Sequence, residues 1–243
     1  MRPDTWAMFT DPAIWRFFGE GLTQTLELSV ASVALSFVVG LAFALGRLSS
    51  RRWIRWPSTA YVEAIRALPV LLLIVYFDIK GSSLFRPLFG EDFELPRFWA
   101  GVLGLSLYTS AVLAEIIRAG ILTLPRGQTE ASRALGLSYP QTMRFVVLPQ
   151  ALRLMVPAMM GQLTTVIKDT SLVGTIGVFD LLRQGRTIYT QFFNPIEVLL
   201  IVASIYFVIC FVLSQLSRRL ELGRITPEAK VRMTELELRD QAA

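Results

Sequence analysis

The apolar stretch LSVASVALSFVVGLAFALG, from Leu28 to Gly46, contains no charged residue. About 20 consecutive, mostly apolar residues cross a bilayer as an α-helix, and the segment from Leu22 to Glu27 extends this run to that length. A helix in lipid satisfies its backbone hydrogen bonds within itself. We therefore predict a first membrane span at about 22–46.

Further apolar runs predict spans at about 57–77, 98–122, 152–168 and 197–217. Of the 243 residues, 53% are hydrophobic and only 18% are charged, which leaves little room for a soluble domain. The predicted fold class is an all-α, polytopic membrane protein with about five transmembrane helices. Residues 22–219 would form this transmembrane domain, after an outer segment at 1–21 and before a cytoplasmic tail at 220–243.

Basic residues gather in two of the connections between the runs. Arg47, Arg51, Arg52 and Arg55 follow the first run, and the connection 124–153 is also basic, whereas the loop before the third run is acidic. The positive-inside rule then places the N-terminus outside and the C-terminus inside. The formal net charge of +5 is thus assigned to contact with membrane lipid and not with nucleic acid.

Two of the predicted spans contain residues that interrupt helices. Pro69 predicts a kink at the polar end of the second span. The fourth run contains Pro157 and Gly161 and then meets Lys168 and Asp169. We expect a broken or re-entrant helix there, because irregular backbone at membrane depth survives only where protein or water satisfies it.

Catalysis and metal binding by this chain are not expected. The sequence has no histidine and one cysteine, which removes the commonest general base and the commonest transition-metal ligand. It also has no GxxxxGK[ST] sequence for holding nucleotide phosphates. We therefore expect no enzyme activity and no cofactor on this chain, and we expect that any ATP and magnesium bind to a partner.

The long connection 124–153 carries the most informative pattern. Thr129 to Leu135 has the composition of a short amphipathic helix, Gly136 can adopt the left-handed backbone that ends it, and Pro140 prevents its continuation. Such a helix, exposed outside the membrane, suits docking into a groove on a cytoplasmic partner.

This connection resembles the cytoplasmic signature of the membrane subunits of ATP-binding-cassette importers, in the polar amino acid permease family that includes the histidine, glutamine and glutamate systems. The signature is Glu-Ala-Ala, three residues, Gly, nine residues and Ile-x-Leu-Pro. The stretches GLTQTLELS, EAIRALPVLLLIVYF and IKDTSLVGTIGVFDLLRQ are also similar to this family. The matching positions here are Glu130, Ala131, Ser132, Gly136, Val146, Leu148 and Pro149.

The resemblance implies a permease subunit that moves polar amino acids across a prokaryotic cytoplasmic (inner) membrane by alternating access. Its implied partners are cytoplasmic nucleotide-binding ATPase subunits, a second permease subunit as homo- or heterodimer, and an extracytoplasmic amino-acid-binding protein. The ATPase-docking residues would be Glu130, Ala131, Ser132, Gly136, Leu137, Leu148 and Pro149.

Two pairs of opposite charge recur with the same three-residue spacing near span ends. Glu63 with Arg66 and Glu115 with Arg118 would each share a helix face, either as ion pairs at the cytoplasmic mouth or as solvated headgroup positions.

Polar residues beside the expected helix break are candidates for the substrate pathway. Charge at membrane depth is expensive unless it faces water or a partner, although the run could simply reach the interface there. The candidates are Lys168, Asp169, Thr170, Ser171 and, near the outer end of the first span, Glu27.

The alternative function is a channel or an ion-coupled secondary transporter of small polar solutes. It would predict more spans or an internal repeat, and it gives the cytoplasmic helix no purpose.

Overall fold

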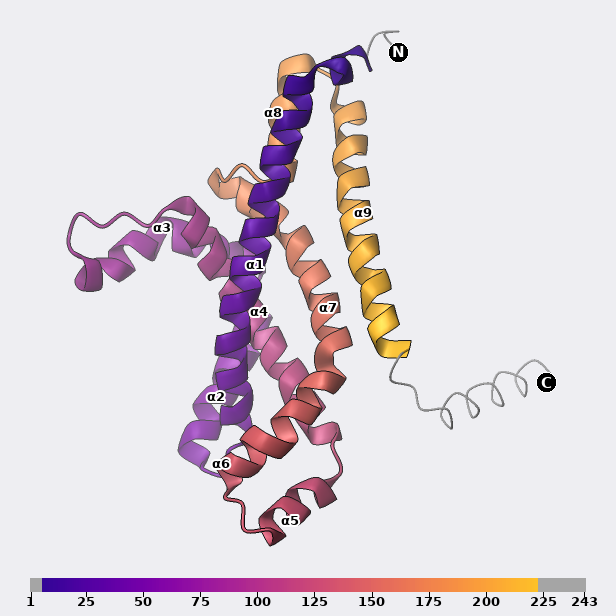
Figure 1. Cartoon of the computed structure of the whole chain (residues 1–243). Helices are drawn as coiled ribbons and strands as arrows, with labels where there is room; N and C mark the ends of the chain where they lie inside the picture. The colour runs from indigo at the N-terminus through magenta and orange to yellow at the C-terminus, as the bar shows by residue number, and fades with distance from the viewer. Residues whose placement is uncertain (1–5, 223–243) are drawn as a thin grey trace, which may run out of the picture.

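The computed structural model describes residues 6–222, which form helices and connecting turns without any strand. The all-α prediction is thus confirmed for this part of the chain. Figure 1 shows an elongated bundle, with α8 and the start of α1 at one end and α2, α5 and α6 at the other. The elements are η1 (Ala7–Thr10), α1 (Pro12–Leu48), α2 (Arg52–Ala67), α3 (Val70–Phe89), α4 (Arg97–Thr123), α5 (Arg126–Ala134), α6 (Tyr139–Thr142), η2 (Met143–Val147), α7 (Leu148–Val173), η3 (Gly174–Ile176), α8 (Leu181–Phe192) and α9 (Pro195–Leu222).

Helix α1 is longer than the span predicted at 22–46, because it begins at Pro12. The Asp11 side chain accepts a hydrogen bond from the backbone N–H of Ala13 at 2.8 Å, and proline is favoured in the first turn. The 37 residues of α1 therefore exceed the roughly 20 that cross a bilayer. Residues 12–21, expected within an outer segment, belong to this helix.

The stretch predicted as one span at 57–77 consists of two helices. Helix α2 ends at Ala67 and α3 begins at Val70, with Leu68 and Pro69 extended between them. The kink expected at Pro69 is thus a complete interruption, because proline disfavours a helical conformation in the residue before it. Helices α2 and α3 together return the chain to the start of α4 (Figure 1).

Four helical stretches within residues 6–222 are long and apolar enough to cross a membrane: Pro12–Leu48, Arg97–Thr123, Tyr139–Ile176 and Pro195–Arg219. They contain the spans predicted at 22–46, 98–122, 152–168 and 197–217. The third is longer than predicted because α6, η2 and α7 follow one another without a break. The tail that was assigned to the cytoplasm lies almost entirely outside the described residues.

Small residues hold α1 and α4 together at the centre of the bundle. The Ser36 hydroxyl donates to the carbonyl of Ser106, and the Ser106 hydroxyl donates to the carbonyl of Ser32, each at 3.2 Å. A Cβ on Gly40 would lie 2.8 Å from the carbonyl oxygen of Ser110. Close backbone approach and hydrogen bonds between helices are typical of membrane bundles, since lipid provides no hydrophobic drive for association.

Helices α3 and α4 approach each other just as closely at Gly104. A Cβ there would lie 2.6 Å from the Cα of Ile74, so Gly104→Ala must push two backbones apart. We expect a loss of roughly 1–3 kcal/mol, measured as a lower thermal unfolding temperature in detergent. Gly161→Ala is the matched control, because Gly161 is also helical and has nothing within 4 Å of its Cβ position. Equal unfolding temperatures for the two variants would contradict this packing.

Candidate functional site

Helix α5 and its cap form the predicted docking element. The helix begins at Arg126, three residues before the predicted start, because it follows directly on Pro125. Gly136 has φ +84°, which confirms the predicted left-handed backbone. The N–H of Leu137 donates to the carbonyl of Ser132 at 3.2 Å, and that of Gly136 donates to the carbonyl of Arg133 at 3.0 Å. These two bonds form a Schellman motif, which fixes the end of the helix.

The cap leaves one side of α5 free. Ser132 is buried, and its hydroxyl donates to the carbonyl of Gln128 at 2.6 Å. Glu130, on the opposite side of the helix, and Ala131 are exposed, and Leu135 at the C-cap is 84% exposed. A capped helix with an exposed carboxylate and an exposed leucine has the form of a docking knob.

The second half of the predicted docking set lies where η2 meets α7. Leu148 is half-buried and Pro149 is exposed. Pro149 has no N–H for an intrahelical bond, and the π-helical turn η2, Met143–Val147, directly precedes α7. Four residues, 135–138, connect α5 to α6, and α6, η2 and α7 then follow one another without a break. No pattern in the sequence predicted the π turn.

A chain of four alternating charges joins α1, α2 and α4. The Arg47 guanidinium donates to Glu115 at 2.5 Å and to Glu63 at 3.1 Å. Arg118 donates to both carboxylate oxygens of Glu115, at 3.2 and 2.5 Å. Of the two alternatives that the sequence left open for Glu115 and Arg118, the structure has the ion pair. Glu63 is paired with Arg47 instead of Arg66, because Arg47 on α1 projects into the space between α2 and α4.

Arg47 is the residue that sequence reasoning missed in this cluster, and its side chain is only 11% exposed. We expect Arg47→Met to lower the thermal unfolding temperature more than Glu63→Gln, whose carboxylate is 60% exposed and whose contact contributes under about 1 kcal/mol. The double variant Arg47→Met, Glu115→Gln should lose less stability than the sum of the two single losses, because both substitutions break the same contact. Strictly additive losses would contradict a shared cluster.

The predicted helix break beside Lys168 and Asp169 is wrong. Helix α7 continues to Val173, and the chain then forms the 3-10 turn η3 and reaches Gly177, which has φ +91°. The break therefore lies after the polar cluster. The hydroxyls of Thr170 and Ser171 have hydrogen-bond partners within α7, since each donates to the backbone carbonyl three residues earlier at 2.7 Å.

The four residues of the cluster point in different directions. Lys168 is exposed, Asp169 and Ser171 are half-buried, and Thr170 is fully buried. Thr170 therefore does not reach a pathway in this conformation. Lys168 and Asp169 form no ion pair among residues 6–222, because neighbours on a helix point about 100° apart.

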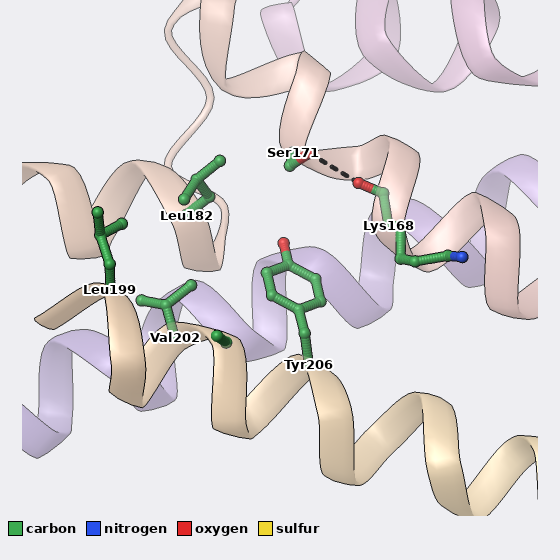
Figure 2. A pocket seen from close by; sticks show the side chains of 7 residues that line it. Lys168, Ser171, Leu182, Leu199, Val202 and Tyr206 are labelled. Carbon is green, nitrogen blue, oxygen red and sulfur yellow. Dashed lines mark hydrogen bonds between the residues drawn. The ribbon is translucent and has the colours of Figure 1, made fainter. Parts of the chain in front are cut away.

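A cavity of about 310 Å³ lies between α7, α8 and α9. Figure 2 shows the Tyr206 hydroxyl pointing into it, whereas the Lys168 ammonium points away. The cavity is mainly apolar. Its lining residues are Lys168, Ser171, Leu182, Leu199, Val202, Ala203 and Tyr206.

Helix α8, which the sequence analysis did not predict, is fixed by a buried carboxylate. Asp180 is fully buried and accepts from the backbone N–H of Arg183 at 3.1 Å. It also accepts from the Tyr206 hydroxyl at 3.4 Å, and the N–H of Leu181 donates to Thr25 at 3.0 Å. Asp180 before a helical pattern is an N-cap signal that could have revealed α8.

Glu27 lies at the inner end of a polar stripe on α1, formed by Arg16, Glu20, Thr23, Gln24 and Glu27. These residues border an open depression on the side of α1 away from its buried residues Phe18 and Thr25. Polar side chains on a membrane helix avoid lipid. Glu27 is therefore one of five residues that form a continuous polar surface on α1, and not an isolated polar position. Sequence reasoning singled out Glu27 and missed the helical periodicity of the others.

Residues 21–224 match the family described as "Binding-protein-dependent transport system inner membrane component". The chain is 37% identical over 224 residues to the glutamate transport system permease protein of Corynebacterium glutamicum, covering 89% of this chain and 78% of the relative. It is 36% identical over 208 residues to a probable glutamine ABC transporter permease protein of Bacillus subtilis, covering 83% and 92%.

Two kinds of solved structure share the fold. A crystal structure of an amino acid ABC transporter with histidines matches with a TM-score of 0.78 and 34% identity, over 92% of this chain and 100% of that one. An inward-facing methionine ABC transporter matches with a TM-score of 0.67 and 22% identity, over 86% and 99% of the chains.

Proposed function

Because this chain belongs to the family of binding-protein-dependent transport system inner membrane components, we propose that it is the permease subunit of an ATP-driven amino acid importer. The observation that carries the proposal is its similarity, over most of its length, to permeases named for amino acids. The exposed, capped helix α5 favours an ATP-driven transporter, which needs a docking element for its ATPase. A channel or an ion-coupled carrier needs no such element.

Energy would come from separate ATPase subunits, since this chain has no sequence for holding nucleotide phosphates. ATP and magnesium would bind there. Helix α5 would enter a groove on each ATPase, with Glu130, Ala131 and Leu135 at its exposed surface. Movement of the ATPase would reach the bundle through Leu148 and Pro149, where the docking element joins α7.

The pathway would lie beside Asp169 and the polar stripe that ends at Glu27. Amino acids carry an ammonium and a carboxylate, so a pathway needs polar groups that replace part of their hydration. Asp169 can accept hydrogen bonds from an ammonium, and Lys168 can donate to a carboxylate. A second permease subunit would complete the pathway, and an extracytoplasmic binding protein would deliver the substrate.

Reconstitution tests the proposal. The chain would be co-expressed with candidate ATPase and binding-protein subunits from the same organism and purified in detergent, and the mass of every copurifying subunit would be measured. In vesicles, uptake of glutamate, glutamine, arginine or histidine should require ATP inside and binding protein outside. Uptake that persists without ATP and follows an ion gradient would favour the secondary transporter.

Cysteine labelling in cells tests the orientation in a prokaryotic cytoplasmic membrane. We expect the N-terminus outside and the C-terminus inside, because the basic connections lie at the end that carries α5. In cells, an impermeant thiol reagent should label Glu91→Cys and spare Arg51→Cys, in a background with Cys210→Ala. The reverse pattern of labelling would overturn this topology.

A further inference from the structure

The N-terminal turn of α2 carries an exposed group of arginines and tryptophans. We call this group the basic corner; it consists of Arg51, Arg52, Trp53, Arg55 and Trp56. All five side chains are exposed, and the two tryptophans are 71% and 77% exposed. Two large aromatic side chains so far out of the bundle require an explanation other than packing of the fold.

The opposite face of α2 explains why the basic corner points outwards. Ser58 and Val62 are buried, and Ile54, Tyr61 and Ile65 are half-buried, so one face of the helix is fixed against α1 and α4. Tyr61 anchors this face further, because its ring stacks on Phe43 with centroids 3.8 Å apart. The orientation of the tryptophans therefore follows from the packing of the helix.

The tryptophans begin an apolar stripe along the outer side of α2. Trp53, Trp56, Ala60 and Ala64 are all exposed, and their spacing of three and four residues places them on one helix face. Arg52 lies beside this stripe, and Arg55 lies further round the helix on the same side. An apolar stripe with arginines along one side has the pattern of a helix at a lipid interface, with the aromatic rings at the level of the headgroups.

The three arginines of the basic corner carry charge that no carboxylate in the described part of the chain neutralises. Arg47, a few residues earlier, binds Glu63 and Glu115. Within residues 6–222, no carboxylate lies within ion-pair distance of Arg51, Arg52 or Arg55, and Arg51 lies 5.9 Å from the centre of the Trp53 ring. Guanidinium groups bind phosphate oxygens in pairs of parallel hydrogen bonds, so an anionic headgroup complements this charge.

We propose that the basic corner binds the headgroup of an anionic phospholipid in the cytoplasmic leaflet. The arginines contact the phosphate, and the stripe that begins with Trp53 and Trp56 contacts the acyl chains. Helix α2 lies at the same end of the molecule as α5 (Figure 1), which is the end predicted to be cytoplasmic, where the membrane surface is anionic. The proposal is independent of the substrate and of the ATPase.

Fluorescence quenching by brominated lipid tests it on the full chain, reconstituted without its partner subunits so that their tryptophans do not contribute. Trp6, Trp15 and Trp99 would be replaced by phenylalanine, so that Trp53 and Trp56 report alone. Phosphatidylcholine vesicles would contain a minor fraction of either brominated phosphatidylglycerol or brominated phosphatidylcholine. We expect stronger quenching by the anionic lipid.

Substitution of the three arginines then distinguishes lipid binding at the basic corner from non-specific attraction of the whole protein to anionic lipid. Each arginine near an anionic surface adds roughly a fivefold preference, so the triple variant Arg51→Gln, Arg52→Gln, Arg55→Gln should lose at least about tenfold in preference for phosphatidylglycerol. The control Arg16→Gln, Lys80→Gln, Arg186→Gln changes the same charge elsewhere and should keep it. All six side chains are exposed, so unfolding temperatures should not differ.

Four results would overturn the proposal: equal quenching by the two lipids, a preference that survives in the triple variant, a preference equally lost in the control, or displacement of the lipid by inorganic phosphate. The last would assign the corner to free phosphate. Removal of residues 224–243, which carry four acidic and four basic residues, tests one more occupant of the corner. A lipid preference that exists only in the shortened chain would mean that this segment, and not a lipid, covers the corner.

Discussion

Asp169→Ala is expected to reduce amino acid uptake by about 10- to 100-fold while the transporter still assembles. The magnitude corresponds to the loss of a hydrogen bond between charged groups, about 1.5–3 kcal/mol. Asp169 is half-buried on α7 and has no ion-pair partner among residues 6–222. Its carboxylate is thus available to a substrate ammonium, and uptake into vesicles measures its contribution.

The neighbours of Asp169 explain why the effect should centre on this residue. Thr170 is buried and Ser171 donates to the carbonyl of Lys168, so neither offers a free hydroxyl proton to the substrate. Lys168 is exposed, but in Figure 2 its ammonium points away from the cavity between α7 and α9. Of the four candidates on α7, Asp169 is the one carboxylate, and it is therefore the one that can accept hydrogen bonds from a substrate ammonium.

Two further variants make the test specific. Asp169→Asn keeps the size and loses the charge, so it should also impair uptake. Asp92→Ala removes a carboxylate from the exposed loop before α4 and should leave uptake unchanged. Failure of the Asp169 variants to assemble would indicate a structural role for the carboxylate. Normal uptake by assembled Asp169→Ala would show that the pathway lies in another segment.

Sequence periodicity predicted the long helices well, because lipid permits few alternatives to a helix. The span predicted at 98–122 coincides almost completely with α4, Arg97–Thr123. Helix ends were harder to predict. The start of α1 depends on a cap at Asp11, and the separation of α2 from α3 depends on two residues, so neither follows from hydropathy.

Features of the candidate site that depend on neighbouring residues in the sequence were predicted correctly. Features that depend on contacts between different helices were missed. Gly136 adopts the left-handed backbone that its position after a short helix indicates. By contrast, the pairing of Glu63 with Arg47 joins residues from two helices, and helix spacing alone suggested Arg66. The end of α7 lies after Lys168 because Asp180 and Gly174 pack together there, with a Cβ on Gly174 only 2.7 Å from the Asp180 carboxylate.

Gly136→Leu is expected to uncouple transport from ATP hydrolysis without unfolding the membrane domain. Gly136 has φ +84° and nothing within 4 Å of its Cβ position, so leucine would meet no clash. The whole effect would come from the left-handed backbone, which costs a residue with a side chain about 1–2 kcal/mol. The population with the Schellman cap would then fall by roughly 5- to 30-fold.

Gly136→Asn separates backbone conformation from the loss of a glycine, because asparagine adopts the left-handed conformation more readily than leucine. We expect uptake to be largely retained in Gly136→Asn and to fall in Gly136→Leu in proportion to the lost cap, while unfolding temperatures stay equal. Uptake and ATP hydrolysis would be measured on the same vesicles. Equal uptake by the two variants would show that the cap does not carry the coupling.

Glu130→Arg tests the exposed side of the same helix, where the backbone is not disturbed. Glu130 is exposed, so its reversal should leave the chain stable in isolation and act mainly at the partner. An ATPase groove that accepts this carboxylate would instead meet a like or unpaired charge, which weakens docking. Uptake should therefore fall further in Glu130→Arg than in Glu130→Gln, and the ATPase should copurify less well. If both variants retained the partner and transported normally, α5 would not be the docking element, whatever the effect of Gly136→Leu.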